Sequence, residues 1–135
     1  MDAAAPVIRV VAADDHAAYL RATTETLTRA GLQVVGIARS GDGAIESVRA
    51  LAPDVVLVDL RMPGLTGAEV ARLISAGHPG TRVVILSAYS DREIVELALA
   101  AGATSFVSKD SPPEEIVRAV RRAADGQATV AVAGG

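Results

Sequence analysis

The sequence predicts an α/β fold in which a doubly wound parallel sheet of five strands, in the order 2-1-3-4-5, is covered by five helices. The main observation is that apolar runs of strand length alternate with segments whose apolar residues recur at helical spacing. The apolar runs are nearly continuous, which is typical of parallel strands buried on both faces. With 135 residues, of which 50% are hydrophobic and 21% charged, the chain can form one domain with its own core.

The first half of the chain contains three predicted strands and two predicted helices. The strands are the apolar runs over 7–13, 32–38 and 55–59. The first helix, 16–31, shows helical spacing and ends at Gly31, a residue type that often terminates helices. The second helix, 42–52, places its apolar residues on one face, as expected of a helix that covers a sheet.

The second half contains three predicted helices and two predicted strands. A capping-box pattern, in which Ser or Thr precedes Glu by three residues, opens each helix. The boxes begin at Thr66, Ser90 and Ser111, the helices cover 66–76, 91–101 and 112–124, and the strands cover 82–88 and 104–108. Residues 126–135 are small and uncharged, and we expect a linker or tail there.

Composition excludes several classes of function. The chain has no cysteine, which excludes disulfides, thiolate metal sites and cysteine nucleophiles. The net charge of −3 does not favour a nucleic-acid surface, and no signal peptide or membrane span is recognisable, so a cytoplasmic domain is expected. Aromatic residues are rare, and each position that has one, Tyr19, Tyr89 or Phe106, is therefore of interest.

Polar side chains follow the predicted strands at the edge where a doubly wound sheet binds its ligands. Asp14 and Asp15 follow the first strand, Asp59 ends the third, Ser87 ends the fourth and Lys109 follows the fifth. Three close carboxylates repel one another, and one lysine cannot neutralise them, whereas Mg²⁺ can. A carboxylate at such a site can act as the nucleophile toward a phosphoryl group and form an aspartyl phosphate.

Each of these residues, taken singly, also has an ordinary structural explanation. Asp14 and Asp15 could cap a helix and complement its dipole. Asp59 could be a solvated strand end, and Ser87 and Lys109 could be surface groups. Their joint arrival at one sheet edge favours a phosphoacceptor site.

Four motifs carry a resemblance to a known family. They are DDH at 14–16, VLVDLRMPGLTG at 56–67, ILSA at 85–88 and GATSFVSKD at 102–110. Together they closely resemble the receiver domains of two-component response regulators, most like the NarL/FixJ/LuxR-type group. The resemblance implies a flavodoxin-like (CheY-like) receiver domain over residues 1–125, followed by a linker or tail toward an output domain that the sequence does not contain.

The resemblance also implies a role for each site residue. Asp59 would accept phosphate from a sensor histidine kinase, and Lys109 would contact the phosphoryl group. Asp14 and Asp15 would hold Mg²⁺ together with Asp59 and the main-chain carbonyl of Arg61. Weak self-phosphorylation and autodephosphorylation would be the only catalysis, so the chain is not expected to be an enzyme by its main function.

A switch is implied as well. Ser87 would hydrogen-bond a phosphoryl oxygen, and Phe106 would occupy the switch-aromatic position. The chain departs from the family in two places: Phe106 lacks the hydroxyl of the commoner Tyr, and Asp110 replaces the proline that often follows Lys109. Whether the peptide between Lys109 and Asp110 is cis or trans is left open by the sequence.

The helix over 91–101 is apolar on more than half of its circumference, so it is either deeply buried or in contact with a partner. Together with strand 104–108 and helix 112–124 it could contact a second copy or an output domain. That output domain would be a helix-turn-helix, absent here, which would bind DNA and regulate transcription.

Two other functions compete with the switch. One is a phosphorylation-independent interaction module with the same fold, which is disfavoured because all the acidic residues and Lys109 are present. The other is an aspartyl phosphohydrolase. Such an enzyme needs a second Asp two residues after the nucleophile, where this chain has Arg61.

Overall fold

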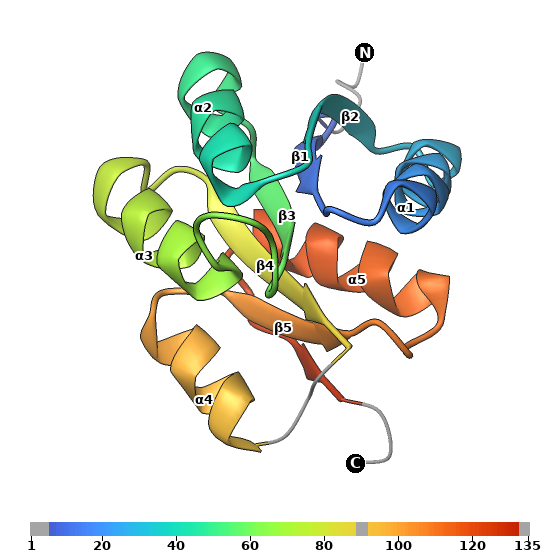
Figure 1. Cartoon of the computed structure of the whole chain (residues 1–135). Coiled ribbons are helices and arrows are strands. Elements are labelled where there is room, and N and C mark those ends of the chain that lie inside the picture. Colours follow the sequence, from blue (N-terminus) through green and yellow to red (C-terminus); the bar gives the residue numbers. More distant parts are fainter. Residues whose placement is uncertain (1–5, 89–91, 133–135) are drawn as a thin grey trace.

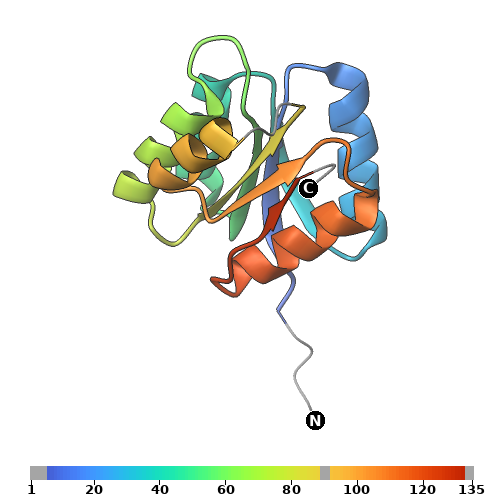
Figure 2. The same ribbon diagram turned by 90° about the horizontal axis from the view of Figure 1, so that it is seen from below.

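A computed structural model of the chain describes residues 6–88 and 92–132 and shows a parallel sheet between two layers of helices. Helices α1 and α5 cover one face of the sheet, and α2, α3 and α4 cover the other (Figures 1 and 2). The helices are α1 (Ala17–Arg29), α2 (Gly41–Leu51), α3 (Gly67–Gly77), α4 (Arg92–Ala100) and α5 (Pro113–Ala124).

The strands lie in the order β2-β1-β3-β4-β5-β6, which confirms the predicted order and adds a short sixth strand. Their bounds are β1 (Arg9–Ala13), β2 (Gln33–Ala38), β3 (Val55–Asp59), β4 (Arg82–Ser87), β5 (Ser105–Ser108) and β6 (Val130–Ala131). All neighbouring strands are parallel, so the carboxyl ends of β1 to β5 meet at one edge.

Two hydrophobic cores lie on the two faces of the sheet, because successive strand residues point to opposite sides. Val56 and Val58 of β3 belong to the core under α2, α3 and α4, which also contains the fully buried Phe106. Val55 and Leu57 of the same strand belong to the core under α1 and α5. Every residue of β3 is buried, as its continuous apolar sequence predicts.

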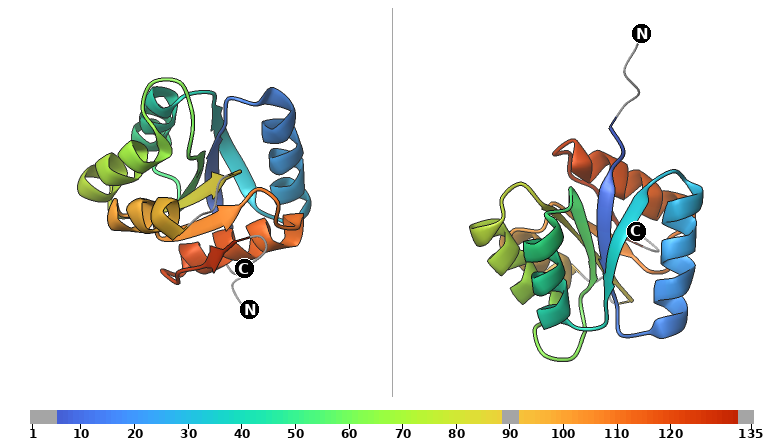
Figure 3. Two further views of the ribbon diagram at one scale, coloured as in Figure 1. Left: turned by 60° about the horizontal axis from the view of Figure 1, so that its bottom comes forward. Right: turned by 90° about the horizontal axis from the view of Figure 1, so that it is seen from above.

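The segment over 126–135, where we expect a linker or tail, contains a short strand, β6. Within it Val130–Ala131 pairs with β5, and Figure 3 shows this strand beside β5 at the edge of the sheet. The main-chain N–H of Phe106 donates to the carbonyl oxygen of Thr129 at 2.9 Å. Nε of Arg122 on α5 donates to the Thr129 hydroxyl at 3.0 Å, so the segment is anchored to both a strand and a helix.

The three predicted capping boxes have different outcomes. Thr66 Oγ1 accepts a hydrogen bond from Glu69 N at 3.1 Å, and the Glu69 carboxylate accepts one from Thr66 N at 2.8 Å, which confirms the first box. The box at Ser111 is wrong, because Pro112 occupies the N-cap position and no side chain caps α5. The box at Ser90 lies outside the described residues.

The C-terminus of α2 has an arginine cap that comes from a strand. Ala52, just after the helix, has a φ of 45°, in the left-handed region that residues other than glycine rarely adopt. Arg9 of β1 donates from its NH1 to the carbonyl oxygens of Leu51 at 2.8 Å and Ala52 at 3.1 Å. These bonds satisfy carbonyl groups that the helix itself leaves unpaired.

Across residues 6–88 and 92–132 no helix has the length and apolar character that a membrane span requires.

Candidate functional site

The loop after β3 leaves the Asp59 carboxylate at a strand end that other elements approach closely. Gly64 has a φ of +77° and allows the turn that follows Pro63. A Cβ atom on Gly67 would lie 2.7 Å from the carbonyl oxygen of Asp59, so only glycine lets α3 begin this close to the strand. The Gly67 N–H also donates to the carbonyl of Leu60 at 2.8 Å, which closes the loop over itself.

Asp14 connects the first strand to the site through both carboxylate oxygens. It is the residue after β1, and its N–H donates to the carbonyl of Ala38 at the end of β2 at 3.1 Å. Its Oδ1 accepts from the main-chain N–H of His16 at 2.9 Å, and its Oδ2 accepts from Lys109 Nζ at 2.7 Å. The side chain is buried and is therefore held in one place.

Lys109 lies between two carboxylates. Its Nζ is 2.7 Å from Asp14 Oδ2 and 3.3 Å from Asp59 Oδ2, and only 13% of its side chain is exposed. Its main-chain N–H donates to the carbonyl of Ser87 at 2.8 Å, which fixes the loop after β5 against β4. Burial alone would lower the pKa of Lys109, but the hydrogen bond to Asp14 and the charges of Asp59 and Asp14 outweigh burial and raise it.

Asp59 itself is 5% exposed. Burial raises the pKa of its carboxyl above the ordinary value. The ammonium of Lys109 acts in the opposite direction, and the carboxylate of Asp14 adds to the increase. A backbone hydrogen bond from Arg61 also favours the charged form, but it is the smallest of these effects. The carboxylate is therefore poorly solvated although it lies at the surface edge of the sheet.

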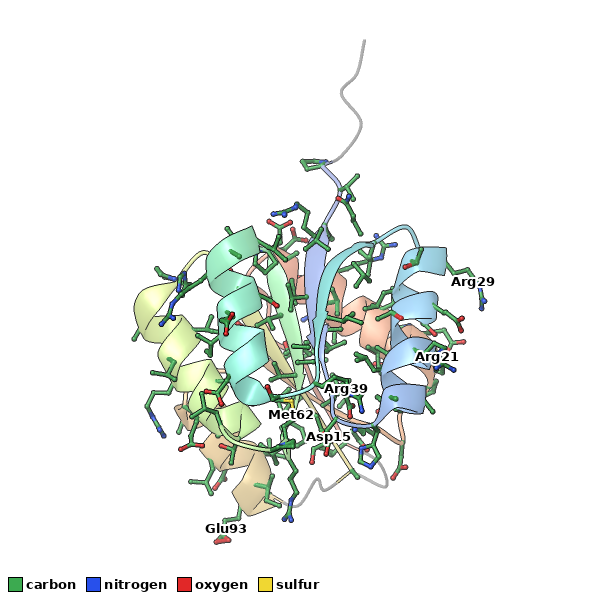
Figure 4. All side chains as sticks on the ribbon, turned by 45° about the horizontal axis from the view of Figure 1, so that its top comes forward. Asp15, Arg21, Arg29, Arg39, Met62 and Glu93 are labelled. Carbon is green, nitrogen blue, oxygen red and sulfur yellow. The ribbon has the colours of Figure 1, made fainter. Side chains whose placement is uncertain are left out.

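Asp15 is the more exposed member of the acidic group. Its main-chain carbonyl accepts a hydrogen bond from NH2 of Arg39, which follows β2, at 2.9 Å. Figure 4 shows Asp15 and Arg39 together at one end of the molecule, whereas Arg21 and Arg29 project away from α1. The Oδ1 atom of Asp15 is buried and finds no hydrogen-bond partner among the described residues, although His16 Nδ1 lies 3.3 Å away.

These residues fit a divalent cation. One ligand atom from each of Asp14, Asp15, His16 and Asp59 lies within 4.8 Å of the others, as metal sharing requires. When ionised, the three carboxylates outnumber the ammonium of Lys109 by two negative charges, the charge that one Mg²⁺ ion balances. The buried oxygen of Asp15 is a free oxygen ligand of the kind that Mg²⁺ prefers. The acidic cluster is typical of a receiver Mg²⁺ site.

The structure brings four predicted site residues, Asp14, Asp15, Asp59 and Lys109, together at the carboxyl edge of the sheet. Ser87 is buried at the end of β4, and Asp59 pairs with the residue before it. Phe106 is fully buried in the middle of β5, and Arg61 is exposed, two residues beyond the end of β3. No cis peptide bond occurs in the described parts of the chain, so the bond between Lys109 and Asp110 is trans.

Two residues that contact the site, Arg39 and Tyr19, are not among the site residues predicted from the sequence. Arg39 follows the second strand at the same sheet edge, and the rule that located Asp59 could have located it too. Tyr19 was noted only as a rare aromatic. Its ring centroid lies 4.4 Å from Nζ of Lys109, a contact between α1 and the loop after β5 that no local pattern reveals.

Comparison with known sequences agrees with this geometry. The profile of the response regulator receiver domain matches residues 10–121. The "Probable transcriptional regulatory protein NarL" of Mycobacterium tuberculosis is 42% identical over 125 residues, which are 92% of this chain and 58% of that protein. The "Response regulator GacA" of Pseudomonas viridiflava is 38% identical over 122 residues, 90% of this chain and 57% of that protein. The chain thus spans a little over half the length of these relatives.

Solved structures give the same result. The signal receiver domain of NarL from Mycobacterium tuberculosis superposes with a TM-score of 0.88 at 40% identity, covering 91% of this chain and all of that one. A two-component response regulator of the LuxR family from Aurantimonas sp. SI85-9A1 superposes with a TM-score of 0.87 at 29% identity. The match covers 92% of this chain and 89% of that one. The chain therefore belongs to the response regulator receiver domain family of two-component signalling, and not to a class of enzymes.

Proposed function

We propose that the chain is a phosphorylation-controlled signalling switch in which Asp59 accepts a phosphoryl group from a phosphohistidine of a sensor histidine kinase. One observation supports this above all: Asp14, Asp15, Asp59 and Lys109 converge at the carboxyl edge of the sheet. A purely structural ion pair would need one carboxylate for one ammonium. The two additional carboxylates are suited to a site that also holds a cation and an anionic group.

In the proposed transfer, one Oδ atom of Asp59 attacks phosphorus, so that a P–O bond forms as the P–N bond of phosphohistidine breaks. The imidazole leaves with the electron pair of that bond, as a neutral ring when its second nitrogen carries a proton. Burial of Asp59 favours the attack because it leaves the carboxylate poorly hydrated. Lys109, already 3.3 Å from Asp59, can donate to an oxygen of the incoming phosphoryl group.

Asp14, Asp15, Asp59 and the main-chain carbonyl of Arg61 are the proposed ligands of Mg²⁺. When bound, Mg²⁺ supplies positive charge that offsets the carboxylates and the oxygens of the transferring group. Arg39 would not itself bind the ion, but its hydrogen bond to the main-chain carbonyl of Asp15 fixes the loop that carries the ligands Asp14 and Asp15.

Ser87 and Phe106 are the proposed switch residues. In the proposed active state Ser87 hydrogen-bonds a phosphoryl oxygen and the position of Phe106 changes. The ring of Phe106 is fully buried in this structure. Because it lacks a hydroxyl, packing alone decides between its inward and outward positions. Phosphorylation can shift this equilibrium only by as much as it binds one state better than the other.

The proposed output surface is formed by helix 91–101, strand 104–108 and helix 112–124, which would contact a second copy or an output domain. On α4 Leu97 is 63% exposed, although Val95 and Ala98 are buried. A large exposed apolar side chain beside the buried stripe favours contact with a partner. In a longer protein of the NarL kind, the output would be transcription through a helix-turn-helix domain, in the cytoplasm, with all DNA contact in that domain.

The test is intact mass after incubation with Mg²⁺ and acetyl phosphate. We expect a gain of one phosphoryl group that depends on Mg²⁺ and disappears in Asp59→Asn. Asp110→Asn is the matched control, because it removes an exposed carboxylate directly beside Lys109 and should leave the gain unchanged. If neither acetyl phosphate nor beryllofluoride acts on the site, the switch is refuted and the phosphorylation-independent interaction module is favoured.

A further inference from the structure

The ammonium of Lys109 has a third neighbour besides its two carboxylates. The ring of Tyr19, from the first turn of α1, lies with its centroid 4.4 Å from Lys109 Nζ. This is well within the distance of roughly 6 Å at which a cation is attracted to the face of an aromatic ring. The contact joins two segments that are far apart in the sequence.

The three contacts together hold the ammonium in one place. Asp14 Oδ2 lies 2.7 Å from it, Asp59 Oδ2 lies 3.3 Å from it, and the ring of Tyr19 adds a third contact. A lysine side chain has many rotamers, so an ammonium with carboxylates alone could follow either of them or turn toward water. The ring limits that freedom, because leaving it loses an electrostatic contact in a largely water-excluded place.

Tyr19 can perform this role because its ring is itself held by packing. The ring packs against the core under α1 and α5. Together with Asp14, Leu20 and Leu57 it lines a small cavity of about 10 Å³. The hydroxyl oxygen is buried, and its polar neighbour is the side chain of Thr23, one turn further along α1. The face of the ring is therefore the part of Tyr19 that acts on the site.

We propose that Tyr19 is a positioning residue for phosphoryl transfer, whose ring face holds the ammonium of Lys109 between Asp14 and Asp59. The proposal rests on the proposed function, since it assigns to Lys109 a contact with the transferring phosphoryl group. Tyr19 touches neither the phosphoryl group nor the nucleophile and acts only through Lys109. A tyrosine that merely filled the core would affect stability but would show no specific coupling to Lys109.

The test compares two substitutions that keep or remove the ring. Phosphorylation of Asp59 by acetyl phosphate at saturating Mg²⁺ is followed by intact mass. Tyr19→Leu removes the π face and is expected to slow phosphorylation about three- to tenfold. Tyr19→Phe keeps the ring and should recover most of this loss. Leu20→Ala is the matched control, since it removes buried apolar surface from the same helix and the same cavity and should lower stability without slowing the reaction.

A double-mutant cycle separates positioning from packing. In a Lys109→Met background, Tyr19→Leu should have no further effect on the rate, because the group through which Tyr19 acts is gone. Equal slowing in both backgrounds would overturn the proposal, as would equal slowing by Tyr19→Phe and Tyr19→Leu. A wild-type chain that gains no phosphoryl group would instead refute the proposed function, on which this inference depends.

A second measurement tests the contact independently of activity. In the NMR spectrum the ε-methylene protons of Lys109, held near the ring face, should show an upfield ring-current shift. We expect the shift to persist in Tyr19→Phe and to vanish in Tyr19→Leu. Ordinary lysine chemical shifts for Lys109 in the wild-type chain would refute the geometry on which the proposal is built.

Discussion

Removal of divalent cations is expected to destabilise the fold by an amount that follows the Mg²⁺ concentration. The perturbation acts on Asp14, Asp15 and Asp59, whose carboxylates exceed the single ammonium of Lys109 by two negative charges. Because the unfolded chain does not hold these groups together, a cation that binds them stabilises the folded state alone.

The magnitude follows from linkage and from the size of the chain. Mg²⁺ at ten times its dissociation constant should contribute about 1.4 kcal/mol, and at one hundred times about 2.7 kcal/mol. For 135 residues the entropy of unfolding is about 0.28 kcal/mol/K. The corresponding increases in Tm are about 5 °C and about 10 °C.

The assay is thermal unfolding followed by circular dichroism, with EDTA or increasing Mg²⁺ and with ionic strength held constant by a monovalent salt. Asp59→Asn should greatly reduce the dependence of Tm on Mg²⁺, whereas Asp110→Asn should retain it. A Tm that is the same in EDTA and in millimolar Mg²⁺ would refute the reasoning that the carboxylates form a cation site. So would an unchanged Mg²⁺ dependence in a chain that lacks both Asp14 and Asp15 carboxylates.

Three further predictions concern stability. Burial raises the pKa of Asp59, so its ionisation destabilises the folded state increasingly as pH rises from about 4 through the raised pKa. In metal-free buffer Asp59→Asn should therefore be more resistant to urea at pH 7 and equal to wild type near pH 3. Arg9→Met should lower the free energy of unfolding by about 0.5–1.5 kcal/mol in a urea titration, because it removes the donor to the Leu51 and Ala52 carbonyls, which water can only partly replace. Ala52→Gly should raise the free energy of unfolding by about 0.5–1 kcal/mol in the same titration, because the relief of left-handed strain exceeds the added entropy of the unfolded chain. A loss of stability in this variant would contradict the prediction.

The fold and the acidic site were predictable because both depend on simple periodicity. Alternation of apolar runs and helical segments determines a parallel α/β sheet, and its topology brings Asp14, Asp59 and Lys109 to one edge whatever the details of packing. The ends of the elements, the short strand β6 and the side-chain contacts between elements were beyond such reasoning. The contact of Tyr19 with Lys109 depends on how α1 is rotated against the sheet, which spacing along the chain does not determine.

Two local features were not predicted, for identifiable reasons. The segment that contains Val130–Ala131 has small residues and a nearby glycine, and its pairing with β5 is accompanied by hydrogen bonds from Phe106 and Arg122 to Thr129. At α5 the residue pattern of a capping box was present, but Pro112 took the N-cap position and the helix began at Pro113. In both cases a contact or a neighbouring residue outweighed the local pattern.

The sixth strand also bears on how the sheet avoids pairing, strand to strand, with the sheet of another molecule. An open sheet has two edges whose unpaired main-chain groups can recruit a strand from another molecule and begin aggregation. Here β6 covers β5, the strand that holds Phe106, and is itself only two residues long, too short to serve as a template for an incoming strand. At the opposite edge the register between β1 and β2 shifts after Val10, which makes β2 irregular. Both edges of the sheet thus leave little regular main chain for unwanted pairing.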